Sequence, residues 1–293
     1  MQTTEGYITM DDGVRLYFEK AGSGSTALII LNGFLYFDDF KYLESGHTLI
    51  SLDLRNRGRS DFVSDVPKLK RGIHQDVDDL EVVRRHFGLQ QIHLLAHSYT
   101  GLTVMLYAMN YPAHVNRIVQ INPIPPDCAK QYPAPLGNVD ATLLEFFGKI
   151  QELEKERSSE DPIRFCKRFW SHLRAIYVAN PADAGKITSW ERCDLATERN
   201  LMSYWVGCLV PSIQSVHLTG RDLAGVKSPV LIVHGTKDRS SPYGGAKDWA
   251  SMLPNAQLIT VEDVAHAPWI EAPEQVLGPL QTFLQSSVSA KGN

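Results

Sequence analysis

Short apolar runs alternate with amphipathic stretches up to residue 122 and again after residue 229. Residues 27–31 and 48–54 are such runs, and an uninterrupted apolar run is typical of a strand buried on both faces. Residues 72–86 carry apolar side chains at helical spacing, and Gly88 is a typical stop after them. The pattern predicts the α/β fold class, with a mostly parallel sheet and helices on both faces.

The other core elements follow from the same patterns. Asp12-Gly13 suits a tight turn, so we expect a hairpin around it. Its strands are expected at residues 6–10 and 14–20. Further strands are expected at 91–97, 115–122, 229–234 and 257–261, and further helices at 101–111 and 274–284.

Residues 124–218 interrupt this alternation. Consecutive prolines such as Pro125 and Pro126 cannot continue a central strand, and the residues after them are rich in charge and large aromatic side chains. We therefore expect a core domain of residues 1–123 and 219–293, with a helical cap inserted at 124–218. Such an insertion lies over the carboxyl ends of the strands, where parallel sheets bind ligands.

Composition narrows the class of protein. The 293 residues are 43% hydrophobic and 21% charged, which is ordinary for a soluble globular protein. A net charge of −4 without a basic stripe argues against nucleic acid as a partner. No apolar run is long enough to span a bilayer, and the N-terminus lacks the pattern of a signal peptide. We expect a cytoplasmic protein without a membrane partner.

The four cysteines are far apart and contain no Cys-x-x-Cys pair. Free thiols are the expectation, with a disulfide among them left open, and no metal site is expected. The four are Cys128, Cys166, Cys193 and Cys208.

Ser98 stands where an expected strand runs directly into an expected helix. A sharp strand-to-helix turn strains the serine backbone and exposes its hydroxyl above the sheet. The turn needs small residues two positions before and after the serine. Ala96 meets the first requirement, whereas Thr100 stands at the second with Gly101 just beyond. Taken alone, Ser98 could equally be an ordinary helix N-cap.

Two further residues make Ser98 a candidate nucleophile. Asp238 falls in the loop after one buried strand, and His266 lies just past the last strand. A serine hydroxyl needs an adjacent base, and that base needs a third group to hold its tautomer. The chain order serine, aspartate, histidine suits this type of sheet. Asp263 is an alternative acid, while His97 and His234 are expected to be structural.

The loop after residues 27–31 is expected to complete the site. The backbone N–H groups of Phe34 and Tyr99 are the candidate oxyanion hole. The aromatic side chains of Tyr36, Phe37 and Trp269 fall on loops expected to ring the serine, so we expect them to form an apolar substrate pocket.

These segments together resemble the α/β-hydrolase superfamily, in its capped branch of esterases and proline iminopeptidase-like enzymes. Residues 53–60 resemble the family's Asp-x-Arg-x-x-Gly-x-Ser loop, and residues 266–273 resemble its histidine loop. The resemblance covers nearly the whole chain. Three positions depart from the family pattern, namely Asn32 in place of histidine, and Thr100 and Ala265 in place of glycine. The first departure weakens the peptidase interpretation, while Asp53, Arg55 and Ser60 are expected to brace the loop.

The resemblance and the three residues imply a serine hydrolase that forms an acyl-enzyme and needs no cofactor. The expected substrate is a small or medium carboxylic ester. The alternative is an aminopeptidase acting on an N-terminal proline amide, for which Glu191, Asp194 and Glu198 are the candidate ammonium ligands. A non-hydrolytic lyase, oxygenase or receptor on the same fold is a third possibility.

Overall fold

One sheet of eight strands runs through the computed structural model, which describes residues 3–157 and 160–286. The strand order across the sheet is β1-β2-β4-β3-β5-β6-β7-β8. The strands from β4 to β8 pair in parallel, whereas β2 pairs antiparallel with both β1 and β4. The strands are β1 (Thr4–Thr9), β2 (Arg15–Ala21), β3 (Ala27–Leu31), β4 (Thr48–Leu52), β5 (Ile92–His97), β6 (Val115–Ile121), β7 (Val230–Gly235) and β8 (Ala256–Val261).

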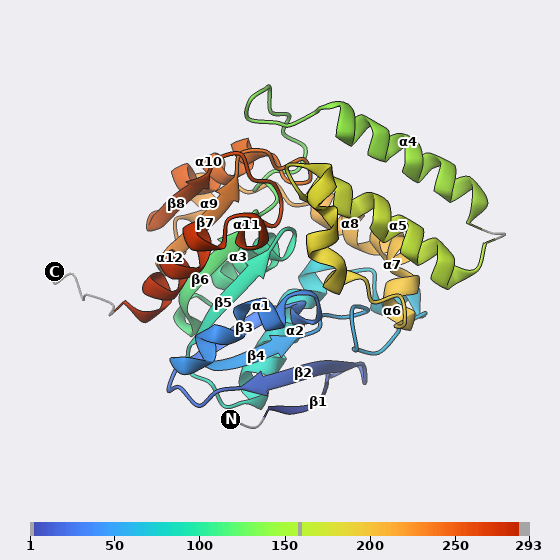
Figure 1. Cartoon of the computed structure of the whole chain (residues 1–293). Coiled ribbons are helices and arrows are strands. Elements are labelled where there is room, and N and C mark those ends of the chain that lie inside the picture. Colours follow the sequence, from blue (N-terminus) through green and yellow to red (C-terminus); the bar gives the residue numbers. More distant parts are fainter. Residues whose placement is uncertain (1–2, 158–159, 287–293) are drawn as a thin grey trace.

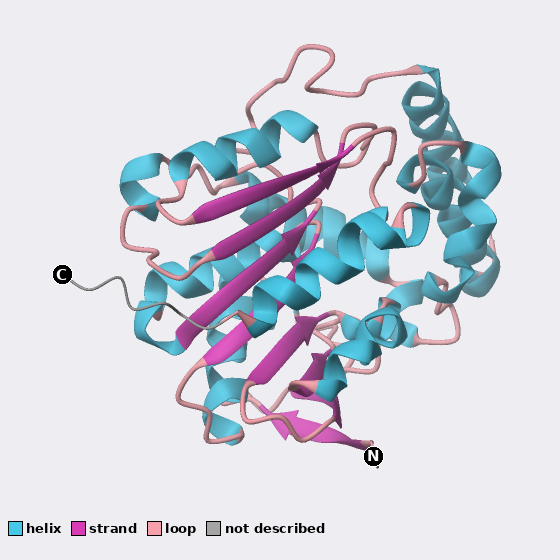
Figure 2. Ribbon diagram, turned by 60° about the vertical axis from the view of Figure 1, so that its left-hand side comes forward, coloured by secondary structure: helices cyan, strands magenta, loops and turns pink. Residues whose placement is uncertain are grey.

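Helices cover both faces of the sheet, as Figure 2 shows. One face packs against α2 (Ile73–His86), α3 (Thr100–Asn110) and α10 (Tyr243–Met252), and the other packs against α1 (Phe37–Phe40), α11 (Pro268–Glu271) and α12 (Pro273–Gln285). Alternation along β3 shows the division. Ile29 and Leu31 join the first core, while Leu28 and Ile30 join the second. Both faces of β3 are therefore buried, as its uninterrupted apolar sequence predicts.

The chain between β6 and β7 is helical, and we call residues 124–218 the cap segment. Its helices gather at the edge of the sheet towards which the parallel strands point (Figures 1 and 2). They are α4 (Ala141–Glu156), α5 (Pro162–Tyr177), α6 (Ala196–Arg199), α7 (Leu201–Tyr204) and α8 (Val210–Gln214), and α9 (Gly220–Leu223) follows them. The division into a core domain and a cap domain remains a prediction. The outermost residues of the expected core domain, 1–2 and 287–293, lie outside the described part of the chain.

The predicted core elements are confirmed with boundary differences of one or two residues. The expected hairpin is β1 and β2, and Gly13 in its turn has a φ of 84°, a conformation that suits glycine. The short helix α1 and the helix α10 were not predicted. No helix in the described residues is long and apolar enough to cross a membrane.

One expectation about the cysteines is wrong. Cys166 on α5 and Cys193 form a disulfide within the cap segment, while Cys128 and Cys208 are free. Disulfides are typical of oxidising compartments, so cysteine usage no longer argues for the reducing cytoplasm. Two cysteines 27 residues apart carry no local pattern that predicts their contact.

The buried carboxyl of Asp76 on α2 has no ion pair in the described part of the chain, unlike the carboxyl of Asp79 on the same helix. Asp79 forms a two-pronged ion pair with Arg55, with both N–O distances 2.9 Å. Asp76 is also buried, and its Oδ1 has no hydrogen-bond partner among the described residues. Burial and the charge of Asp79 raise the pKa of Asp76 well above its usual value, although Arg55 and Arg57 act against this.

We therefore expect Asp76→Asn to stabilise the protein more at pH 8 than at pH 5. The folded protein holds the Asp76 proton more tightly than the unfolded chain, so the wild type loses stability as the pH rises from about 4 towards the folded pKa. The gain grows by up to ~1.4 kcal/mol per pH unit in that window. Urea denaturation at several pH values measures it. Asp78→Asn on the same helix is the control, and an equal pH slope in both variants would contradict the prediction.

Candidate active site

The turn between β5 and α3 gives Ser98 its position. Its φ of 59° lies in the left-handed region, which is strained for a residue other than glycine. The Ser98 N–H donates to the carbonyl of Ile121 at 3.0 Å, and the N–H of Ile124 donates to the carbonyl of Ser98 at 3.3 Å. These bonds tie the turn to the end of β6. They hold the serine at the carboxyl edge of the sheet, with its side chain partly exposed.

Thr100 fits the turn because its hydroxyl bonds back to the strand. Thr100 Oγ1 donates to the carbonyl of His97 at 2.7 Å. The same hydroxyl oxygen accepts from the N–H of His97 at 2.9 Å. The close approach that requires a glycine falls one residue later. A Cβ on Gly101 would lie 2.7 Å from Cβ of Pro123. The imperfect motif therefore still forms the sharp turn.

Asp238 and His266 meet in the interior, as the sequence order predicts. Asp238 lies just beyond β7 and His266 just before α11, and both side chains are fully buried. His266 Nδ1 lies 2.7 Å from Asp238 Oδ2. The second ring nitrogen, Nε2, is buried without a hydrogen-bond partner in the described part of the chain. The cap segment also supports the histidine, because the His266 N–H donates to the carbonyl of Tyr177 at 3.0 Å.

Asp238 is held ionised by its surroundings. Asn122 Nδ2 donates to Oδ2 at 2.6 Å, and the N–H groups of Ser240 and Ser241 donate to Oδ1 at 2.8 and 2.9 Å. Burial by itself raises the pKa of Asp238, but the charge and hydrogen bond of His266, with that of Asn122, outweigh it and lower the pKa. A carboxylate in this state can fix the tautomer of His266 and stabilise its cation.

The neighbouring titratable groups have other partners. The side chain of Asp263 is 86% exposed and lies 3.6 Å from Lys237, so it does not replace Asp238. His97 Nε2 lies 2.8 Å from the carbonyl of His266. Burial and the charge of His266 keep the pKa of His97 well below its usual value, and burial also lowers the pKa of His234. Both neutral rings fit a structural role.

One half of the expected oxyanion hole already has an acceptor in the structure. The N–H of Phe34 donates to Asp53 Oδ1 at 3.3 Å, and the Phe34 side chain does not line the cavity beside Ser98. Tyr99 does line that cavity, and its N–H has no acceptor among the described residues. The contact between Phe34 and Asp53 joins two loops that are adjacent only after folding, which is why the sequence pattern missed it.

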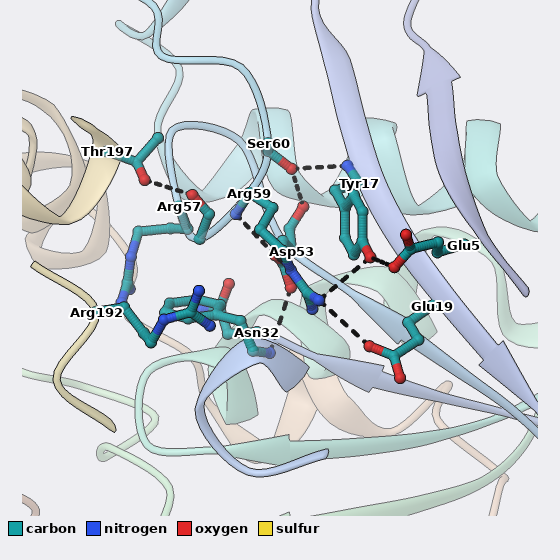
Figure 3. A network of polar contacts seen from close by, with 12 residues as sticks. Glu5, Tyr17, Glu19, Asn32, Asp53, Arg57, Arg59, Ser60, Arg192 and Thr197 are labelled. Atoms are coloured by element: carbon teal, nitrogen blue, oxygen red, sulfur yellow. Dashed lines mark hydrogen bonds and ion pairs between the residues drawn. The ribbon is translucent and has the colours of Figure 1, made fainter. Parts of the chain in front are cut away.

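The loop of residues 53–60 is braced as predicted, and Figure 3 shows the network. Asp53 Oδ2 accepts from the N–H and Nε of Arg59, at 2.8 and 3.1 Å. Ser60 Oγ donates to the carbonyl of Asp53 at 2.6 Å and accepts from the N–H of Tyr17 at 2.9 Å. Asp53 thus holds its own loop and the Phe34 loop together.

The other two departures from the family motif also have local reasons. Asn32 has a φ of 54°, a conformation that asparagine tolerates, and its Oδ1 accepts from the N–H of Leu54 at 3.2 Å. At Ala265, the residue that must be glycine is its neighbour Gly235, at the end of β7, and an alanine is tolerated at position 265 itself. A Cβ on Gly235 would lie 2.4 Å from the carbonyl oxygen of Ala265.

Ser98 opens into a cavity of about 510 Å³ between the sheet edge and the cap segment. Tyr36 lines it as predicted, but Phe37 and Trp269 do not. Trp269 packs behind Tyr36, with ring centroids 5.7 Å apart, and Phe37 belongs to the core below. Most of the wall is apolar and comes from the cap segment: Leu143, Phe146, Phe147, Ile150, Phe169, Trp170, Leu173, Ile176, Tyr177, Trp190, Leu201, Met202, Trp205, Val210 and Ile213.

Residues 26–273 match the family model described as the alpha/beta hydrolase fold. The chain belongs to the α/β-hydrolase family. It is 25% identical to a proline iminopeptidase of Clostridioides difficile (strain 630), over 98% of this chain and 100% of that protein. It is 26% identical to a bifunctional esterase/perhydrolase of Acinetobacter calcoaceticus, over 96% of this chain and 100% of that protein. A bromoperoxidase structure from Bacillus anthracis shares the fold, with a TM-score of 0.72, 18% identity and coverage of 97% and 100%.

The three acids considered for an ammonium site in this α/β-hydrolase do not line the cavity. Glu191 lies 3.5 Å from Arg174, and Asp194 is 63% exposed beside Arg192. Glu198 is buried and accepts from Nε of Arg57 at 3.1 Å. Its Oε1 also accepts from the N–H of Gly58 at 3.0 Å, so Glu198 joins α6 to the loop of residues 53–60.

Sequence reasoning missed several side chains of the site. Asn122 directly follows β6, and a polar residue just after an apolar strand was the available signal. Arg57 and Arg239 both line the cavity. Arg239 Nε bonds Asp140 at 2.7 Å and Nη1 bonds the carbonyl of Val178 at 2.7 Å, which ties the loop after Asp238 to the cap segment.

Glu198→Ala is expected to destabilise this α/β-hydrolase by about 3–5 kcal/mol, because it leaves the buried Arg57 guanidinium unpaired. Asp194→Ala, which removes an exposed ion pair of the same segment, is expected to cost about 0–1 kcal/mol. Free energies of unfolding from urea titrations compare the two variants. Equal losses would mean that the buried pair contributes no more than an exposed one.

Proposed function

We propose that this α/β-hydrolase cleaves small or medium carboxylic esters through an acyl-enzyme on Ser98. The main support for this proposal is the set of residues that line the cavity. Its described lining residues include Arg57 and Arg239 but no aspartate or glutamate, and the remaining wall is mainly apolar. A neutral or anionic acyl group suits such a wall, whereas an ammonium group would face two cations without a carboxylate to pair with.

The proposed reaction uses the three predicted residues. Ser98 Oγ attacks the ester carbonyl carbon while His266 Nε2 takes its proton, and Asp238 stabilises the resulting imidazolium. The N–H of Tyr99 donates to the developing oxyanion. His266 then protonates the departing alcohol. Water, deprotonated by His266, attacks the acyl-enzyme and releases the acid, which regenerates the Ser98 hydroxyl. Because Phe34 N–H bonds Asp53, we no longer assign it to the oxyanion.

The proline iminopeptidase alternative has less support from the cavity. A relative of that name is 25% identical to this chain. The carboxylates considered for its ammonium ligands are paired with arginines or exposed outside the lining. A cytoplasmic location also remains a proposal, and the disulfide between Cys166 and Cys193 counts against it.

A substrate panel tests the proposed function. We expect the wild type to hydrolyse p-nitrophenyl acetate, butyrate and hexanoate, and to cleave prolyl p-nitroanilide far more slowly. Ser98→Ala and His266→Ala should each lower kcat by about 10⁴-fold or more, because the three residues act as a unit. Absorbance of the released nitrophenol or nitroaniline gives the rates.

Labelling of Ser98 by a fluorophosphonate probe, located by mass spectrometry, is the companion measurement. A wild type that cleaves no ester and resists the probe would contradict the hydrolase proposal and favour a lyase, oxygenase or receptor. A prolyl arylamide that outperforms every ester would instead establish the peptidase. Circular dichroism and thermal melting check that both variants remain folded.

A further inference from the structure

The hydroxyl of Tyr99 receives hydrogen bonds from two sides. Asn32 Nδ2 lies 2.7 Å from the phenol oxygen, and Arg57 Nη1 lies 3.2 Å from it. All three residues line the cavity that contains Ser98. Tyr99 follows Ser98 directly in the chain, so the cluster forms one wall of the space beside the proposed nucleophile.

The direction of both hydrogen bonds is determined by the neighbours. Asn32 Oδ1 accepts from the N–H of Leu54 at 3.2 Å, so the other end of the amide, the NH₂ group, faces Tyr99. Arg57 can only donate, because a guanidinium has no acceptor atom. Tyr99 therefore acts as an acceptor in both contacts.

A phenol oxygen that accepts twice still has one proton to donate. Burial raises the pKa of Tyr99 to about 12, although Arg57 acts in the opposite direction, so the hydroxyl keeps its proton at neutral pH. No protein group in the described part of the chain accepts this proton. The Tyr99 ring packs against the Trp205 ring, with centroids 5.4 Å apart, and both residues line the cavity. Because Tyr99 lines the cavity, a ligand bound there can accept the proton.

The donors behind Tyr99 are themselves firmly placed. Arg57 Nε and Nη2 bond the two carboxylate oxygens of Glu198, at 3.1 and 3.4 Å. These bonds leave further N–H groups on the guanidinium, which has five donors in all. The cluster thus offers a phenol donor backed by a fixed cation, in a wall that is otherwise mainly apolar.

We propose that Tyr99, held by Asn32 and Arg57, donates a hydrogen bond to a second oxygen of the substrate, apart from the ester that is cleaved. The favoured substrates are then esters whose acyl chain carries a carbonyl or carboxylate oxygen. This inference rests on the proposed ester hydrolysis. It makes Tyr99 a specificity-determining residue through its side chain, in addition to the role proposed for its backbone.

An all-alkyl acyl chain in the same place leaves the phenol donor without an acceptor. A site built to bond a substrate oxygen discriminates against the analogue that lacks it, because the polar group of the site is then buried and unpaired. We expect a preference in kcat/KM of at least about tenfold for the oxygen-bearing ester of matched length.

Matched methyl esters test the proposal, with the released methanol measured enzymatically. Methyl 4-oxopentanoate, 5-oxohexanoate and 6-oxoheptanoate are each compared with the alkyl ester of the same length. Monomethyl glutarate and monomethyl adipate form a second arm, which distinguishes a carboxylate from a neutral carbonyl. At least one oxygen-bearing ester should exceed its alkyl match by about tenfold or more in the wild type.

Tyr99→Phe removes the donor and keeps the ring and the backbone N–H. It should lower kcat/KM for the preferred ester about tenfold more than for its alkyl match. Tyr107→Phe is the matched control on α3, the helix that follows Tyr99, because the Tyr107 hydroxyl bonds Glu81 away from the cavity and should not affect the ratio. Thermal melting of both variants verifies folding.

The outcomes separate the two proposals. Turnover of the alkyl esters without any preference in the wild type would overturn the Tyr99 proposal and leave ester hydrolysis standing. A wild-type preference that survives in Tyr99→Phe would also overturn it. If none of the esters, alkyl or oxygen-bearing, is hydrolysed, both proposals fail together.

Discussion

The left-handed turn at Ser98 is the constraint around which the carboxyl edge of the sheet is arranged. A non-glycine residue adopts this conformation only where the surrounding structure imposes it. Here the turn is held by backbone bonds to Ile121 and Ile124, and by the contact of Gly101 with Pro123. The parallel strands β7 and β8 end at the same edge, and the residues that follow them, Asp238 and His266, contact each other at 2.7 Å. These contacts join the turn after β5 to the end of β6 and the residues beyond it.

Around that turn, the buried carboxylates of Asp238 and Asp53 each have several hydrogen-bond donors. Asp238 receives hydrogen bonds from Asn122, Ser240 and Ser241 as well as His266. Asp53 is enclosed by Arg59 and the Phe34 backbone. Several donors replace the water that each carboxylate loses on burial. They lower the pKa of Asp238, whereas burial outweighs them at Asp53 and raises its pKa. These hydrogen bonds fix the orientation of Asp238 and, through it, of the His266 ring, whereas His266 Nε2 has no partner in the described part of the chain.

The cap segment is part of the site as well as a cover over it. Glu198 orients Arg57, the Tyr177 carbonyl bonds the backbone of His266, and Arg239 reaches the carbonyl of Val178. Most of the apolar wall comes from the same segment. Changes of sequence within residues 124–218 can therefore alter the shape of the cavity while the sheet and the Ser98 turn stay the same.

The alternation of apolar runs and amphipathic stretches determined the strands, the helices α2, α3 and α12, and the order of Ser98, Asp238 and His266 at strand ends, because these follow from spacing along the chain. It did not predict α1 and α10. Folding decided the partners. Phe34 bonds Asp53, 19 residues away, and Arg57 bonds Glu198, 141 residues away. Trp269 packs behind the cavity wall, and Cys166 meets Cys193. A sequence pattern places a residue on an element, but the neighbour of its side chain depends on how elements pack in three dimensions.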